Sequence, residues 1–260
     1  MAQKFGKTKT VRELMEKQII ILAAGKGSRM KSELPKVMHK VGGKPMLEMV
    51  INNAAAVTDE LVLVYSDHIK EYLPLFSDKC KLAYQERQLG TAHAVWVAKP
   101  MIRDDIPVAV LYGDNPLITP GIINELFDHL DSSKAAIDAL VFEHDHPNAY
   151  GRIILDRNGN FEKIVEFKYA DPYQRKIKLC NSGIMAFAPG VLSKYLHYCL
   201  MPSHIPEQEL YLTAIIEIAG KCGEKIAYYT SPDHQLVVGI NTQEELEAAN
   251  DILEGKTSSK

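Results

Sequence analysis

Glycines, a hydroxyl and two basic side chains follow an apolar run near the start of the sequence, in the stretch IIILAAGKGSRM (19–30). The run from Ile19 to Leu22 has no polar alternation, which is typical of a strand buried on both faces. Glycines free the backbone for a positive φ and leave room for a ligand beside the main chain. Exposed N–H groups near Lys26 and Arg29 would form a concave surface suited to phosphate. An ordinary glycine turn is the alternative interpretation.

A second stretch, QERQLGTAHAV (85–95), has side chains that could recognise a planar base. The Gln85 amide carries a donor and an acceptor side by side, which matches the hydrogen-bonding edge of a base. Gly90 would let backbone groups approach the same edge, because it has no side chain. The alternative interpretation is a pair of surface glutamines before a helix with Thr91 as its N-cap. His93, in that helix, is expected to be packed.

A carboxylate and an amide farther along the chain are candidates for a metal site. Asp114 in LYGDNPLI follows an apolar strand, and Asn241 in VVGINTQEEL ends another predicted strand. Mg²⁺ takes oxygen ligands and often binds through one or two carboxylates together with substrate phosphates. The alternatives are a turn aspartate at position 114 and a helix N-cap at position 241, for which Thr242 competes.

Strands and helices alternate through the first half of the sequence, and this order predicts the frame that positions these groups. Strands are expected at residues 19–22, 60–66, 81–84, 107–114 and 135–144, and helices at 45–57, 69–76, 91–102 and 120–130. The alternation predicts an α/β fold with a Rossmann-like, mostly parallel twisted sheet and helices on both faces. Such folds bind ligands beyond the carboxyl ends of the strands, where the glycine-rich loop and Asp114 are expected.

The pattern changes from about residue 145 onward. YGRIILDRNGNFEKIVEF (150–167) reads as a hairpin with its turn at Asn158-Gly159, and LCNSGIMAFAP (179–189) reads as a further strand. We therefore expect a smaller antiparallel part attached to the parallel sheet.

Composition excludes several classes of protein. The chain of 260 residues is 46% hydrophobic and 24% charged, with a net charge of −3, which gives no case for a nucleic-acid or membrane partner. No apolar run is long enough to span a bilayer, and the polar N-terminus lacks a signal-peptide core, so a cytoplasmic location is expected. Widely spaced cysteines without a CxxC motif argue against a disulfide framework and a zinc site; they are Cys80, Cys180, Cys199 and Cys222.

In combination, these motifs resemble those of a known family. LAAGKGSRMKSELPKVMHKVGGKPML resembles the signature of the sugar-phosphate nucleotidyltransferases, the pyrophosphorylases. QLGTAHAV, LYGDNPLI, YGRIILDRNGNFEKIVEFKYA, CNSGI, ELYLT and VGIN follow in the family's order. The set is most similar to the uridyltransferase domain of the bifunctional bacterial N-acetylglucosamine-1-phosphate uridyltransferases. The resemblance therefore implies the nucleotide-diphospho-sugar transferase fold.

The resemblance extends over residues 18 to about 253, which are expected to form a single domain. Its parts would be a nucleotide-binding part (18–144), a sugar-binding part (145–230), and a closing strand and helix up to residue 253. An N-terminal extension (1–17) and a flexible tail (254–260) would flank it.

The resemblance also assigns roles to individual residues. Arg29 and Lys36 would bind the triphosphate and stabilise charge at the reacting phosphorus, and Asp114 and Asn241 would hold a catalytic Mg²⁺. The nucleotide-binding residues would be Leu22, Ala23, Ala24, Gly25, Gly27, Gln85, Gln88, Gly90 and Thr91. The residues that bind the sugar phosphate would be Tyr112, Gly151, Glu166, Asn181, Tyr211 and Thr213.

The implied reaction is attack by a phosphate oxygen of N-acetylglucosamine 1-phosphate on the α-phosphorus of UTP, which releases pyrophosphate and forms UDP-N-acetylglucosamine, a cell wall precursor. The attacking phosphate is already an anion at neutral pH, so no general base is needed. Positioning and electrostatic stabilisation must supply most of the catalysis. Two alternatives are a nucleotidyltransferase for another sugar 1-phosphate or a phosphoalcohol, and an idle nucleotide-sensing module, against which the intact basic and acidic residues argue.

The sequence departs from the family's pattern at a few positions. Ser28 replaces a threonine but keeps a hydroxyl, Ala214 replaces an acid after YLT, and Asn241-Thr242 replaces a doubled asparagine. The last two bear on sugar specificity. Nothing in this sequence resembles the hexapeptide repeats that carry acetyl transfer and trimer formation in the bifunctional enzymes, so no acetylated product is expected from this chain. The oligomeric state stays open.

Overall fold

The computed structural model describes residues 16–144, 149–201 and 209–255, so most of the predicted N-terminal extension and tail lies outside the described residues. The strands are β1 Gln18–Leu22, β2 Lys40–Val41, β3 Lys44–Pro45, β4 Glu60–Tyr65, β5 Lys81–Tyr84, β6 Val108–Tyr112, β7 Ile137–Glu143, β8 Arg152–Leu155, β9 Phe161–Val165, β10 Leu179–Phe187 and β11 Ile226–Thr230. The α-helices are α1 Met46–Ala55, α2 Thr91–Val97, α3 Pro120–Ser133, α4 Val191–Leu196, α5 Ala214–Lys221 and α6 Gln243–Leu253. Short 3₁₀ helices are η1 Ser28–Met30, η2 Lys36–Met38, η3 Asp67–Leu75, η4 Lys99–Met101, η5 Phe167–Tyr169, η6 Gln174–Lys176, η7 His197–Leu200 and η8 His234–Leu236.

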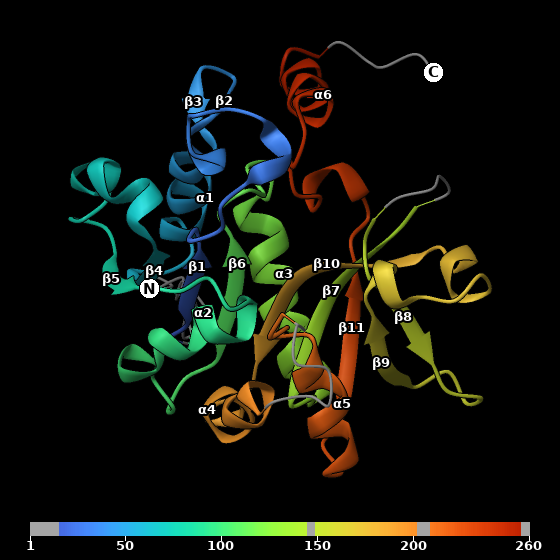
Figure 1. Ribbon diagram of the computed structural model, residues 1–260. Helices are drawn as coiled ribbons and strands as arrows, with labels where there is room; N and C mark the ends of the chain where they lie inside the picture. Colours follow the sequence, from blue (N-terminus) through green and yellow to red (C-terminus); the bar gives the residue numbers. More distant parts are fainter. Residues whose placement is uncertain (1–15, 145–148, 202–208, 256–260) are drawn as a thin grey trace, which may run out of the picture.

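The central sheet is mostly parallel, as the alternating elements predict. Its strand order is β11-β7-β10-β6-β1-β4-β5, and β1 pairs in parallel with both β4 and β6 (Figure 1). Only β10 runs antiparallel to its two neighbours in this order, β6 and β7. The carboxyl ends of β1, β4, β5 and β6 therefore meet at one edge of the sheet.

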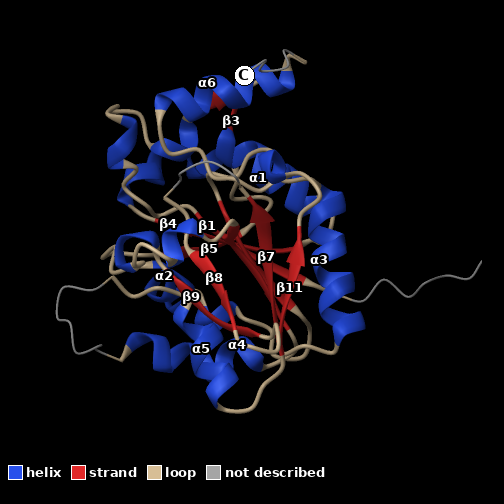
Figure 2. Ribbon diagram, turned by 90° about the vertical axis from the view of Figure 1, so that its right-hand side faces the viewer, coloured by secondary structure: helices blue, strands red, loops and turns tan. Residues whose placement is uncertain are grey.

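Helices cover both faces of the sheet (Figure 2), and β1 shows why its sequence has no polar alternation. Ile19 and Ile21 belong to the apolar cluster that includes residues of α1 and α3, whereas Ile20 and Leu22 belong to the cluster that includes residues of α2, α4 and α5. A strand with helices on both sides buries every side chain, so a continuous apolar run is required. Within the described part of the chain, no helix is both long and apolar enough to span a membrane.

The predicted antiparallel part is present, but its turn is longer than expected. β8 and β9 form a hairpin, and β8 joins the main sheet where Arg152 pairs with Cys180 of β10. The Asp156 N–H donates to the Asn160 carbonyl over 2.8 Å, so the loop has one residue more than the predicted Asn158-Gly159 turn. Gly159 has a φ of 81°, which explains the glycine at this position.

The predicted closing strand before Asn241 is wrong. Residues 238–241 have no regular secondary structure, and the last strand among the described residues is β11, which pairs in parallel with β7. The helix that follows, α6, was predicted correctly. Its N-cap is Thr242, which forms a capping box with Glu245, so the side chain of Asn241 is not used as the cap.

Candidate active site

Two adjoining cavities lie beyond the carboxyl ends of the parallel strands. The loop-side cavity, of about 600 Å³, lies beside residues 22–29, and the hairpin-side cavity, of about 580 Å³, lies beside β8 and β10. Every residue that the sequence proposed for the site lines one or both of them. The residues that line both are Arg29, Thr91, Tyr112, Asp114 and Asn241. The reacting groups of two substrates could therefore meet beside these side chains.

The structure explains Gly25 and Gly27, in the loop after β1, in different ways. Gly27 has a φ of 62°, and a Cβ added there would lie 2.3 Å from the Cβ of Lys36. A glycine is thus required at position 27 to bring Lys36 close to the loop. A Cβ added at Gly25 would meet nothing within 4 Å, so the main chain there is open beside the cavity. This arrangement agrees better with a ligand-binding loop than with an ordinary turn.

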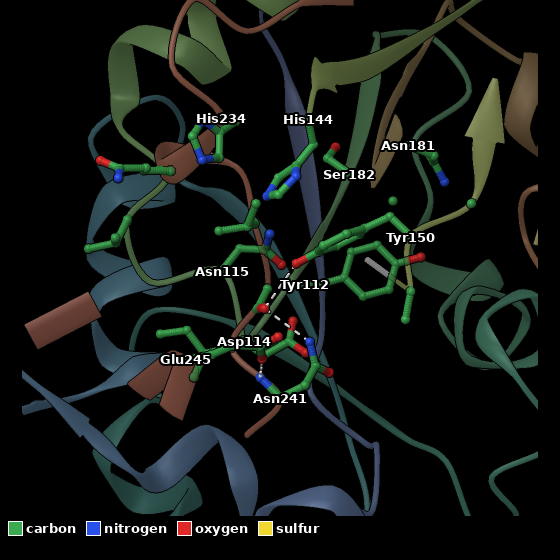
Figure 3. A pocket seen from close by; sticks show the side chains of 18 of the residues that line it. Tyr112, Asp114, Asn115, His144, Tyr150, Asn181, Ser182, His234, Asn241 and Glu245 are labelled. Carbon is green, nitrogen blue, oxygen red and sulfur yellow. Dashed lines mark hydrogen bonds between the residues drawn. The ribbon is translucent and has the colours of Figure 1, made fainter. Parts of the chain in front are cut away.

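Two cations and two oxygen-bearing side chains converge where the cavities meet. The Lys36 Nζ contacts the Oδ2 of Asp114 and lies 2.6 Å from the Oδ1 of Asn241. The Nη2 of Arg29 donates to the same Asn241 oxygen over 2.7 Å. Figure 3 shows Asp114 and Asn241 close together beneath the ring of Tyr112. The side chains of Lys36 and Asp114 are only 11% and 20% exposed, which strengthens their electrostatic interaction.

Backbone contacts hold Asn241 in place, although it does not end a strand. The N–H of Ile240 donates to the Asp114 carbonyl over 2.9 Å, which joins this segment to the end of β6. The side-chain amide of Asn115 donates to the Val237 carbonyl over 2.8 Å. The Nδ2 of Asn241 donates to the Gly239 carbonyl over 3.0 Å, so its Oδ1 faces the cations.

The oxygen pair of Asp114 and Asn241 suits a hard cation. Both oxygens contact one ammonium group, so they are close enough to bind the same ion. Among the described residues, no group of three or more His, Cys, Asp or Glu side chains could hold a metal ion. Mg²⁺ prefers six oxygens and keeps several waters, so substrate phosphates and water would have to complete its shell.

Gln85 is not a surface glutamine. Gln85 is 3% exposed, and its backbone N–H, directly after β5, donates to the Tyr65 carbonyl over 2.8 Å. The Nε2 lies 3.0 Å from the Nδ1 of His93 and 3.3 Å from the Gly90 carbonyl. His93 is therefore more than a packed side chain, because it orients the Gln85 amide. Thr91 is not an N-cap either, because its Oγ1 accepts from the Leu212 N–H.

Polar groups of β10 and the neighbouring loops line the hairpin-side cavity. The Oγ1 of Thr213 donates to the Oε1 of Glu166 over 2.9 Å. Asn181 is 6% exposed, and its buried Oδ1 accepts no hydrogen bond from the described residues. A buried acceptor without a partner is costly, so this oxygen is suited to a ligand hydroxyl or N–H.

A bulge in β10 shapes the same cavity. The register against β7 shifts between Asn181 and Met185, and Gly183 within the bulge has a φ of 90°. A Cβ at Gly183 would lie 2.9 Å from the ring of Tyr112, so glycine lets this ring pack between the two cavities. At Gly151 a Cβ would lie 2.9 Å from the Cγ2 of Ile164, which explains that glycine by packing within the hairpin.

The carboxyl group of Glu166 is a titratable group of this cavity whose pKa departs from its usual value. Burial raises its pKa above the usual value for glutamate, and the negative charge of Glu209 adds to the shift. The hydrogen bond from Thr213 and the charge of Lys168 oppose it. The carboxylate therefore takes up a proton at a higher pH than an exposed glutamate.

We expect acidification to weaken sugar-phosphate use through Glu166. As pH falls through the raised pKa, the carboxylate is protonated and loses an acceptor for ligand hydroxyls, so the KM for the sugar phosphate rises. The measurement is kcat/KM for the sugar phosphate against pH at saturating nucleotide. Glu166→Gln should have a raised KM at every pH and should lack the fall in kcat/KM at low pH. An identical fall in that variant would assign the titration to the substrate phosphates.

Sequence reasoning missed several residues that line the hairpin-side cavity. Tyr150 could have been found, because it directly precedes Gly151 in the motif YGRI. His144 follows β7, so its position at a strand's carboxyl end was an available signal. No signal was available for His234, because it lies in η8, which no periodicity predicts. The rings of His144 and His234 make an edge-to-face contact with centroids 5.2 Å apart.

Comparison with known proteins gives the family. Residues 19–177 match the family model of the MobA-like NTP transferase domain. The bifunctional protein GlmU of Desulfotalea psychrophila is 40% identical over 238 residues, which are 90% of this chain and 70% of that protein. GlmU of Lactobacillus helveticus is 38% identical over 229 residues, which are 87% of this chain but 49% of that protein. This chain thus spans about half the length of the second relative.

Solved structures share the fold. A structure of apo UDP-glucose pyrophosphorylase has a TM-score of 0.72 at 17% identity and covers 93% of this chain and 99% of its own. A putative glucose-1-phosphate thymidylyltransferase from Bacillus anthracis has a TM-score of 0.68 at 19% identity and covers 94% of this chain and 97% of its own. At these identities the likeness shows the fold, that of the nucleotide-diphospho-sugar transferases.

The sequence-based resemblance to pyrophosphorylases is confirmed by these relatives. The family model extends over more than half of the chain and contains the glycine-rich loop, Lys36, Gln85 and Asp114. The similarity to GlmU of Desulfotalea psychrophila extends over 90% of this chain and so includes residues beyond 177. The chain belongs to the MobA-like NTP transferase family and is a sugar-phosphate nucleotidyltransferase.

Proposed function

We propose that this chain transfers a uridylyl group from UTP to N-acetylglucosamine 1-phosphate, forming UDP-N-acetylglucosamine and pyrophosphate. The observation that carries the proposal is the cluster of Arg29, Lys36, Asp114 and Asn241 where two cavities meet. One cavity has a glycine-rich loop and a buried glutamine, and the other has carboxylate and amide acceptors. The similarity to bifunctional GlmU proteins supports this pair of substrates.

In this proposal, the cations carry most of the chemistry. The two substrates are both anionic, so their mutual repulsion and the charge that builds on pyrophosphate are the main obstacles. Arg29 and Lys36 would bind phosphate oxygens and stabilise this charge. The open main chain at Gly25 would provide N–H groups to the triphosphate. Lys36 contacts the oxygens of Asp114 and Asn241, and Arg29 contacts that of Asn241, so both cations would shift from these oxygens to the phosphates when substrate binds.

Asp114 and Asn241 would hold a Mg²⁺ ion. When bound, the ion would neutralise charge on the phosphate oxygens and polarise the reacting phosphorus. Two protein oxygens are too few for a tight site, so we expect binding together with nucleotide. The task of the protein is to orient the two oxygens, which the contacts of residues 237–241 with the end of β6 achieve.

The acceptor sugar would lie in the hairpin-side cavity. The unpaired Oδ1 of Asn181 and the carboxylate of Glu166 are suited to the amide N–H and hydroxyls of an amino sugar. The hydroxyls of Thr213 and Tyr211 line the same cavity. Polar groups of this kind reject analogues that would leave them unpaired.

Release of pyrophosphate tests the proposed function. The purified chain is incubated with Mg²⁺, UTP and N-acetylglucosamine 1-phosphate, and the product is identified by mass spectrometry. The same assay is run with other nucleotides, with other sugar 1-phosphates and with phosphoalcohols. We expect the highest kcat/KM for the named pair. A clear preference for another acceptor would move the assignment to a different nucleotidyltransferase, and no turnover with any pair would leave a nucleotide-sensing module.

Nucleotide selection is expected to depend on Gln85. Replacement by alanine removes the buried amide that is oriented by His93, so the preference for UTP over CTP should fall by about tenfold or more, on the order of 1.4 kcal/mol. The KM for the sugar phosphate should change far less. Glu86→Ala, at the exposed neighbouring position, is the matched control. An unchanged ratio of UTP to CTP use in Gln85→Ala would contradict the assignment.

A further inference from the structure

The loop that leads into α2 and the segment that leads into α5 are hydrogen-bonded to each other. The Leu210 N–H donates to the Leu89 carbonyl over 2.9 Å, and the Ala92 N–H donates to the Leu210 carbonyl over 2.8 Å. The third bond uses a side chain, because the Leu212 N–H donates to the Oγ1 of Thr91 over 2.8 Å. Residues about 120 apart in sequence thus form one unit, which we term the paired segments (89–92 and 210–213).

Gly90 makes this pairing sterically possible. It has a φ of 127°, and a Cβ added there would lie 2.4 Å from the carbonyl oxygen of Leu210 and 2.6 Å from its nitrogen. Both contacts are to main chain, so no side-chain movement could relieve them. The space beside the missing side chain is therefore filled by Leu210, whereas the sequence suggested that it was left for the edge of a base.

The paired segments join the two cavities. Gln85 lines the loop-side cavity and donates to the Gly90 carbonyl, at one end of the unit. Tyr211 and Thr213, at the other end, line the hairpin-side cavity. Thr91 and Tyr112 each line both cavities.

We propose that Thr91 is a positioning residue for the sugar half of the substrate, and that its hydroxyl couples the nucleotide-binding loop to the sugar-binding segment through Leu212. This inference rests on the proposed function for the identity of the two ligand halves. Leu212 is fully buried, and Tyr211 and Thr213 are its neighbours in the sequence. A hydrogen bond that fixes the Leu212 N–H therefore also fixes the direction in which these two neighbours present their hydroxyls. A group that orders two sites at once makes their ligands bind cooperatively.

Loss of the hydroxyl has a specific consequence. Leu212 lies in the core, so its N–H would have no acceptor if Thr91 lost its oxygen. An unpaired buried donor destabilises the arrangement that contains it, which here is the bound geometry of the segment with Tyr211 and Thr213. The nucleotide half would be affected less, because Gln85 is also held by its contact with His93 and by the bond from its backbone N–H to the Tyr65 carbonyl.

A binding experiment on the full chain with two ligands distinguishes the effect on the nucleotide half of the site from the effect on the sugar half. UDP occupies only the nucleotide half, whereas UDP-N-acetylglucosamine occupies both, and isothermal titration measures each Kd. In Thr91→Val, which keeps the shape and removes the hydroxyl, we expect affinity for UDP-N-acetylglucosamine to fall about tenfold more than affinity for UDP. Thr91→Ser restores the hydroxyl and should recover most of the lost affinity.

A second measurement is independent of any substrate. Amide hydrogen exchange of the ligand-free chain should be faster at Leu212 in Thr91→Val than in wild type or Thr91→Ser. Equal weakening of UDP and UDP-N-acetylglucosamine, or exchange at Leu212 that is unchanged, would overturn the inference. Failure of the proposed function would look different, because wild type would then release no pyrophosphate from UTP and N-acetylglucosamine 1-phosphate while the exchange difference persisted.

Discussion

Replacing Asp114 by asparagine is expected to lower kcat by at least about 100-fold, on the order of 3 kcal/mol of transition-state stabilisation. The substitution keeps the shape of the side chain and removes the negative charge that contacts Lys36 and would bind Mg²⁺. The carboxylate is partly exposed, at 20%, and is not packed in the core, so the fold should survive. Steady-state turnover at saturating Mg²⁺ and UTP is the measurement, with thermal unfolding to check the fold.

A matched control and a weaker variant sharpen this test. Asp131→Asn removes a carboxylate of α3 that is 56% exposed and pairs with Lys134, and it should leave kcat unchanged. Asn241→Ala should lower kcat less than Asp114→Asn, because water can replace a neutral ligand. Near-normal turnover of Asp114→Asn would make Asp114 a turn residue and would remove the metal site from the mechanism.

Replacing Lys36 by methionine is expected to lower kcat by about 100-fold or more, and also to change how the protein alone binds divalent cations. The ammonium group contacts Asp114 and lies 2.6 Å from the Oδ1 of Asn241, so it occupies both oxygen ligands when nucleotide is absent. Methionine keeps the methylene groups that pack against Gly27 and removes the charge. Both oxygens then become free for a cation without nucleotide.

Electron paramagnetic resonance of Mn²⁺ measures the second effect without any turnover. Wild type should leave most of the added Mn²⁺ free in the absence of nucleotide, whereas Lys36→Met should bind it more tightly. Lys40→Met, at an exposed position in β2, is the control and should behave as wild type. Equal Mn²⁺ binding by Lys36→Met and wild type would show that the lysine does not compete for these oxygens.

Features that depend on residues close together in the sequence were predicted well. The apolar run before residue 23 predicts β1, because a parallel strand between two helical layers buries consecutive side chains. Pro120 and the apolar spacing after it predict α3, which begins at that residue. The motifs that gave the family also gave every proposed site residue, and the structure places all of them on the two cavities.

The environment of Asn241 shows where this reasoning stops. The apolar residues before it suggested a strand, whereas the structure places them in an irregular segment beneath the end of β6. Burial explains both outcomes, since Val237 is fully buried and Ile240 is 2% exposed without being in a sheet. An apolar run indicates that a segment is buried. Whether the segment is a strand depends on its hydrogen bonds to a distant part of the chain.

The sequence by itself determined the order of the elements, the loop beside β1 and the chemical groups available for phosphate, base and sugar. Only the tertiary structure decided what those groups contact. Gly90 could be read as space for a ligand, yet Leu210 fills that space, and Thr91 could be read as a helix cap, yet it accepts from Leu212. The type of a residue determines which backbone conformations and hydrogen bonds are available to that residue. The partner that uses them comes from a segment about 120 residues away, which no local pattern encodes.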